Sequence, residues 1–136
     1  YERSGPERFL ETFAALRGLV ALGGSAPPAG LAQEVGRLVA ELHALRRMSV
    51  SIAGMLEAGR EPVAEAAIVK DLGTVWEQDL PQRVRDAAAL VPIDSDAYLA
   101  FERVLHYMTR IAPKLTIQGG TTEILRGVIA RGLGLR

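Results

Sequence analysis

The sequence predicts an all-α fold, an antiparallel four-helix bundle followed by a short C-terminal helix. Apolar residues recur at spacings of three and four, and Gly and Pro clusters divide the chain into segments of helical length. No segment shows the alternation of apolar and polar residues that marks a half-buried strand. Short connections between helices of similar length favour antiparallel neighbours. With 136 residues, of which 49% are hydrophobic, residues 1–136 are expected to form a single domain around one core.

The first two helices are separated by a Gly- and Pro-rich segment, residues 23–30. The first is expected from about Pro6 to Leu22, because proline suits a first turn and Gly23-Gly24 readily forms a left-handed cap. The second carries the strongest periodicity and spans about 27 residues, or roughly 40 Å at 1.5 Å per residue. Its stripe consists of Leu31, Val35, Leu38, Leu42, Leu45, Ser49, Ile52 and Leu56.

Three further helices are expected in the second half of the chain. The third runs from Pro62 to about Leu90, and Pro81 should kink it or split it near Leu80. Its predicted core stripe is Ala66, Val69, Leu72, Trp76 and Leu80. The fourth spans about residues 96–112, with a stripe of Tyr98, Phe101, Leu105, Met108 and Ala112. The fifth should begin at Thr121 or Thr122 and end near Arg131.

Composition excludes several classes of site. Sixteen basic and sixteen acidic residues cancel, so no overall field favours nucleic acid or an anionic membrane. Without cysteine there are no disulfides or thiolate sites, and His43 and His106 alone do not make a metal site. No apolar run approaches the roughly 20 residues of a membrane span, and no signal peptide opens the chain, so a cytoplasmic location is expected. The start at Tyr1 suggests a piece of a longer polypeptide.

The tail from Ile117 to Gly134 is the most informative segment. The paired glycines Gly119 and Gly120 let the backbone expose successive amide hydrogens, and Thr121 or Thr122 is suited to capping the helix that follows. Such a corner is a candidate cradle for a partial negative charge or for the polar edge of a ring. It is also compatible with an ordinary turn and helix cap.

Taken as a whole, the tail resembles the C-terminal signature of acyl-CoA dehydrogenases, a Gly-Gly-Thr-x-Glu-Ile-x-Arg-x-x-Ile-Ala-Arg pattern ending in Leu-Gly. The opening Tyr1-Glu2-Arg3-Ser4-Gly5 is similar to the Glu-Arg that begins the family's C-terminal helical domain. The resemblance implies a four-helix bundle that carries part of an FAD and acyl-CoA site. It also implies a homodimer or homotetramer and an electron acceptor such as an electron-transfer flavoprotein.

The resemblance further implies roles for individual residues. Many members carry their catalytic Glu directly before the Gly-Thr of the signature, where this chain has Gly119. Another branch, resembling isovaleryl-CoA dehydrogenase, carries the base in a Glu-Arg context on the first helix, which assigns the base to Glu2. Arg3 would then orient Glu2 or touch the substrate, and Gly119 would approach the substrate through its backbone. The same comparison places Gly120, Thr121 and Glu123 at the cofactor.

Two family motifs are replaced. Leu22 to Pro28 lacks the usual Arg-x-x-Phe-Gly, and Val91 to Tyr98 stands in place of Gln-x-x-Gly-Gly-x-Gly-Tyr. Three interpretations therefore stay open: a catalytic dehydrogenase that uses Glu2, a diverged assembly subunit without turnover, and a relative similar to acyl-CoA oxidases or flavin-dependent monooxygenases.

Overall fold

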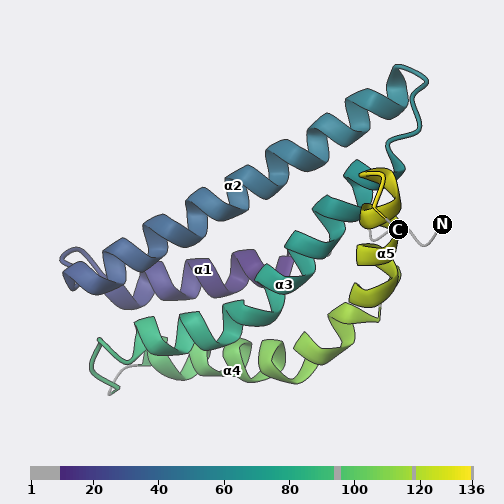
Figure 1. Ribbon diagram of the computed structural model, residues 1–136. Helices are drawn as coiled ribbons and strands as arrows, with labels where there is room; N and C mark the ends of the chain where they lie inside the picture. Colours follow the sequence, from purple (N-terminus) through teal and green to yellow (C-terminus); the bar gives the residue numbers. More distant parts are fainter. Residues whose placement is uncertain (1–9, 94–95, 118, 136) are drawn as a thin grey trace.

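The described part of the chain is entirely helical and contains no strand, which confirms the predicted fold class (Figure 1). The computed structural model describes residues 10–93, 96–117 and 119–135. The elements are α1 (Leu10–Gly23), α2 (Ala29–Glu57), α3 (Val63–Ala88), α4 (Asp96–Ile111), the 3₁₀ helix η2 (Ala112–Thr116) and α5 (Thr122–Gly132). No helix in these ranges is long and apolar enough to cross a bilayer.

Helices α1 and α3 lie at the centre of the arrangement, since each of them contacts both α2 and α4. Helix α5 packs against α3, near the end of the molecule where α3 begins (Figure 1). The four long helices enclose one apolar core, and no residue of α5 is buried. The buried core residues are Ala15, Leu16, Leu19, Leu22, Leu31, Leu38, Leu45, Trp76, Leu80, Val84, Ala87, Ala88, Phe101, Leu105 and Met108.

Several predicted boundaries are confirmed. Helix α1 ends at Gly23, and Gly24 adopts the left-handed conformation expected of a cap, with φ of +57°. Helix α4 begins at Asp96, and its predicted stripe faces the core, with Phe101, Leu105 and Met108 buried. The start of α1 predicted at Pro6 lies outside the described residues.

The stripe predicted along α2 is buried over only half of its length. Leu31, Leu38 and Leu45 are in the core, whereas Ser49 is exposed and Leu56 is 58% exposed. Figure 1 shows the cause: α2 extends past α1 and separates from the rest of the bundle toward its C-terminal end. The predicted stripe therefore lies in the core from Leu31 to Leu45, and residues 46–57 contain no buried side chain.

Helix α3 also differs from its prediction. It is one uninterrupted α-helix from Val63 to Ala88 with Pro81 inside it, so of the two predicted effects of Pro81, a kink or a split, the split does not occur. Leu80 and Pro81 are both buried, and the main chain stays helical although proline lacks an amide hydrogen. Leu72, predicted to lie on the core stripe, is 48% exposed, while Thr74 and Glu77 are buried in the same helix.

Candidate functional site

The candidate site is the corner that joins η2 to α5. Gly119 and Gly120 both have positive φ, 74° and 99°, which side-chain-bearing residues rarely adopt. A Cβ on Gly120 would find ordinary van der Waals space, 3.6 Å from Leu125, so the backbone conformation and not crowding requires glycine there. Thr121 then caps α5, and its Oγ1 accepts a hydrogen bond from the amide of Ile124 at 3.5 Å.

Two polar side chains of α3 hold η2 beneath this corner. Lys70 Nζ donates to the carbonyl oxygen of Leu115 at 3.4 Å and to Thr74 Oγ1 at 3.0 Å. Gln78 Nε2 donates to the carbonyl oxygen of Ala112 at 3.4 Å. These bonds satisfy carbonyls near the end of α4 and in η2 that would otherwise depend on water. Sequence reasoning missed this support, although the spacing of Lys70, Thr74 and Gln78 by four residues was a visible signal of one shared face.

Glu123 is exposed in the first turn of α5 and is held ionised at neutral pH. Its pKa lies below the ordinary range, chiefly because the carboxylate accepts a hydrogen bond from its own backbone amide. A hydrogen bond from Thr121 and the nearby charge of Arg126 act in the same direction. Glu123 thus presents a hydrogen-bond acceptor beside the glycine pair.

An ion pair ties α5 to α3 on the other side of the corner. Arg126 Nε lies 3.5 Å from Asp71 Oδ2, and the Arg126 side chain is largely exposed while that of Asp71 is largely covered. The second oxygen of Asp71 is buried and has no hydrogen-bond partner among the described residues. The pair therefore limits how α5 sits on α3, since Asp71 has no alternative partner in that part of the chain.

The surface around the corner is mixed in character. Ile117 and Ile124 are 71% and 61% exposed, and they lie close in sequence to the glycine pair and to Thr121. Apolar side chains, two glycines without Cβ atoms and an acceptor carboxylate together suit contact with a flat, partly polar group or with another protein surface. Gly119 offers no titratable group, so the position directly before Gly120 and Thr121 supplies no general base.

The structure brings together four of the predicted site residues: Gly119, Gly120, Thr121 and Glu123 form one turn and the start of α5. Glu2 and Arg3 lie outside the described residues. Their predicted approach to the corner therefore stays a prediction.

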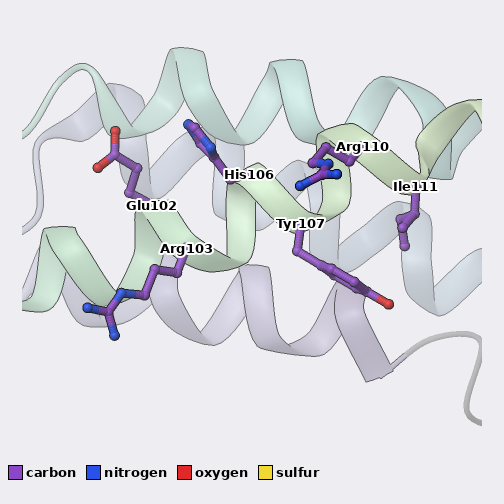
Figure 2. A pocket seen from close by; sticks show the side chains of 6 residues that line it. All are labelled: Glu102, Arg103, His106, Tyr107, Arg110 and Ile111. Atoms are coloured by element: carbon purple, nitrogen blue, oxygen red, sulfur yellow. The ribbon is translucent and has the colours of Figure 1, made fainter.

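A shallow pocket lies elsewhere, along the outer face of α4 (Figure 2). It includes His106 but none of the predicted site residues. Both His43 and His106 are exposed, and the described ranges contain no cluster of three side chains suited to holding a metal ion.

Comparison with known proteins adds one finding. A family model described as "Acyl-CoA dehydrogenase, C-terminal domain" matches residues 9–134. No curated protein and no solved structure matched the chain. The matched range contains every helix described above and the whole corner before α5.

Proposed function

The chain belongs to the acyl-CoA dehydrogenase C-terminal domain family, and we propose that the protein carrying it is an FAD-dependent acyl-CoA dehydrogenase. In this proposal residues 1–136 form a single such domain within a longer polypeptide. The protein introduces a double bond between the α and β carbons of an acyl-CoA thioester. The observation that carries the proposal is that the family match includes the glycine-threonine corner, with its two glycines at positive φ and the ionised Glu123.

The corner is chemically suited to the edge of a flavin. Two successive glycines put no Cβ between their amides and an approaching ring, and Thr121 and Glu123 add a hydroxyl and a carboxylate. Gly120, Thr121 and Glu123 would hold the FAD, and Gly119 would contact the substrate. When bound, FAD supplies the acceptor for the hydride that leaves the β carbon.

The chain's own chemical contribution is the removal of a proton. We assign this step to Glu2, because the position before the Gly-Thr pair is Gly119 and has no side chain that accepts a proton. The Glu2 carboxylate would take the proton from the carbon next to the thioester carbonyl, while Arg3 orients the carboxylate or the substrate. Desolvation by bound substrate would raise the pKa of the carboxyl toward that of the carbon acid.

The test is Glu2→Gln in the full-length protein, measured by anaerobic bleaching of the flavin with a series of acyl-CoA substrates. Loss of a general base is expected to slow reduction by about 10²- to 10⁴-fold while the FAD stays bound. Glu57→Gln, at the far end of α2, is the matched control and should reduce normally. An unchanged reduction rate in Glu2→Gln would remove Glu2 from the mechanism.

A diverged assembly subunit is the second candidate, because two family motifs are replaced. Leu22 to Pro28, which lacks the usual Arg and Phe, forms the end of α1 and the turn into α2, and Leu22 itself is buried in the core. The visible spectrum of the full-length protein separates the candidates. A yellow protein that an acyl-CoA bleaches supports a dehydrogenase, and a colourless protein that copurifies with a second subunit supports assembly. Rapid reoxidation by air would instead indicate oxidase-like or monooxygenase-like chemistry.

We further propose the partners that accompany dehydrogenation. They are an acyl-CoA substrate, an electron acceptor such as an electron-transfer flavoprotein, and other copies of the same protein in a homodimer or homotetramer. A cytoplasmic location is the corresponding proposal for where the reaction occurs.

A further inference from the structure

The side chain of Arg126 in α5 is within reach of two carboxylates. Its Nε lies 3.5 Å from Oδ2 of Asp71 in α3. Glu123 is three residues earlier on the same helix, a spacing at which side chains are neighbours. The pKa of Glu123 is lowered chiefly by the hydrogen bond from its own backbone amide, then by one from Thr121, and the charge of Arg126 adds to both. Asp71 and Glu123 therefore compete for one guanidinium group.

The contact between Asp71 and Arg126 lies close to the corner because α5 runs antiparallel to α3. Gly132 faces Ala64, whereas Arg126 faces Asp71, so the chain moves back along α5 as it moves forward along α3. Thr121 is five residues before Arg126, or roughly 7.5 Å along the helix at 1.5 Å per residue. Of these two contacts between the helices, the ion pair is the one nearer to the candidate site.

The Asp71–Arg126 pair is a weaker link between helices than the contacts of Glu41. Both oxygens of Glu41 accept hydrogen bonds from Arg83, whereas one oxygen of Asp71 meets Arg126, at 3.5 Å. The other oxygen of Asp71 is buried without a hydrogen-bond partner among the described residues, and the Arg126 side chain is 65% exposed. An unsatisfied buried acceptor reduces stability, and an exposed ion pair adds little. The main effect of Asp71 is therefore on where the charge of Arg126 lies.

We propose that Asp71 is a positioning residue of the candidate site: it holds the guanidinium of Arg126 against α3 and so leaves acceptor sites of the Glu123 carboxylate open to a bound ligand. This inference rests on the proposed function, in which that ligand is FAD. Without Asp71, Arg126 pairs with Glu123 on the surface of α5. The guanidinium then occupies the acceptor oxygens that the corner presents beside Gly120 and Thr121.

The first test needs no FAD and follows the carboxyl carbon of Glu123 in the 136-residue chain by NMR during a pH titration. Asp71→Asn is expected to lower the pKa of Glu123 more when Arg126 is present than in an Arg126→Gln background, by at least about 0.3. The second background measures the direct effect of removing the Asp71 charge, so the difference isolates the contribution of Arg126. Asp79→Asn, at an exposed position of α3, is the matched control and should leave the pKa unchanged.

The second test measures the affinity of the full-length apoprotein for FAD by flavin fluorescence. Asp71→Asn should raise the FAD Kd about two- to fivefold, and adding Arg126→Gln should return it to within about 1.5-fold of the original value. If the pair only fastened α5 to α3, the double variant would bind FAD no better than Asp71→Asn alone. The order of the two affinities therefore distinguishes positioning of Arg126 from simple support of the helix.

The outcomes separate this inference from the proposed function. A full-length protein that binds no FAD would contradict the proposed function, and the NMR titration would still decide whether Asp71 controls Arg126. A change in the pKa of Glu123 that is the same in both backgrounds, or an FAD Kd that Arg126→Gln fails to restore, would overturn the inference. Asp71→Ala, which also removes the unsatisfied oxygen, replaces Asp71→Asn in both measurements if that variant does not fold.

Discussion

The side chain of Glu41 in α2 accepts hydrogen bonds from two side chains of α3. Trp76 Nε1 donates to Glu41 Oε2 at 2.7 Å, and both terminal nitrogens of Arg83 donate to the same carboxylate, at 2.5 and 3.2 Å. Arg83 also pairs with Glu34, at 2.7 Å. The pKa of Glu41 lies below its ordinary range, chiefly because of the hydrogen bond from Arg83.

We predict that Glu41→Gln lowers the free energy of unfolding by about 1 kcal/mol at pH 7, a value reduced by the partial exposure of the pair. A carboxyl whose pKa is lowered by folding stabilises the fold above its unfolded pKa of about 4.3. That contribution is lost as the pH falls further, through the folded pKa. Urea denaturation of Glu41→Gln and of the unmodified chain should therefore differ at pH 7 and converge below about pH 4. If the two proteins differed equally in free energy of unfolding at both pH values, the ionised form of Glu41 would not be what stabilises the fold. Glu61→Gln, at an exposed position, is the control.

At this scale the sequence predicts local contacts and misses distant ones. The Thr121 cap was predictable because donor and acceptor lie three residues apart. The bonds of Glu41 to Trp76 and Arg83 span 35 and 42 residues, and no alternation or spacing encodes such pairs. Lys70 and Leu115 are 45 residues apart and were missed for the same reason.

At the scale of elements, α5 meets α3 most closely where Gly132 faces Ala64. A Cβ on Gly132 would lie 2.5 Å from the Cβ of Ala64, and neither group is the end of a flexible side chain. We predict that Gly132→Ala destabilises the docked helix by about 1–3 kcal/mol, measured by thermal unfolding. Gly127→Ala, on the same helix with nothing within 4 Å, is the matched control and should stabilise by up to about 1 kcal/mol.

A second substitution separates crowding from helix propensity. Adding Ala64→Gly to Gly132→Ala removes the clash, so the double variant should recover most of the loss. If Gly132→Ala were as stable as Gly127→Ala, the close contact between α3 and α5 would not exist.

Periodicity predicted which face of each helix is apolar, but not what covers that face. In α2 the same spacing continues from Leu45 to Leu56, yet only the first half has α1 and α3 against it. In α3 the stripe through Trp76 and Leu80 is correct, whereas Leu72 is exposed and Thr74 and Glu77 are buried instead. Crossing angles depend on the packing of ridges from both helices, which one helix's sequence does not specify.

At the scale of the whole molecule, stability is expected to be uneven. The core is built from α1 to α4, while α5 contributes no buried residue and residues 46–57 of α2 contain none either. Local opening of a helix requires less free energy where fewer apolar contacts are broken. The candidate corner lies at the start of α5, a helix at the edge of the core. The Thr121 cap, the Asp71–Arg126 ion pair and the close contact between Gly132 and Ala64 hold this helix in place.

Hydrogen exchange of the full chain tests this distribution. We predict that the amides of residues 122–132 and 48–57 exchange well before those of residues 31–45 and 76–88, because only the latter pack on both sides against the core. Repeating the measurement over a range of protein concentrations adds a control. If the protection of residues 48–57 rises with concentration, another copy of the protein covers the exposed end of α2. If these residues are as protected as the core residues at every concentration, the predicted difference in stability does not exist. Slow exchange in α5 would show that its packing on α3 holds the corner as firmly as burial holds the bundle.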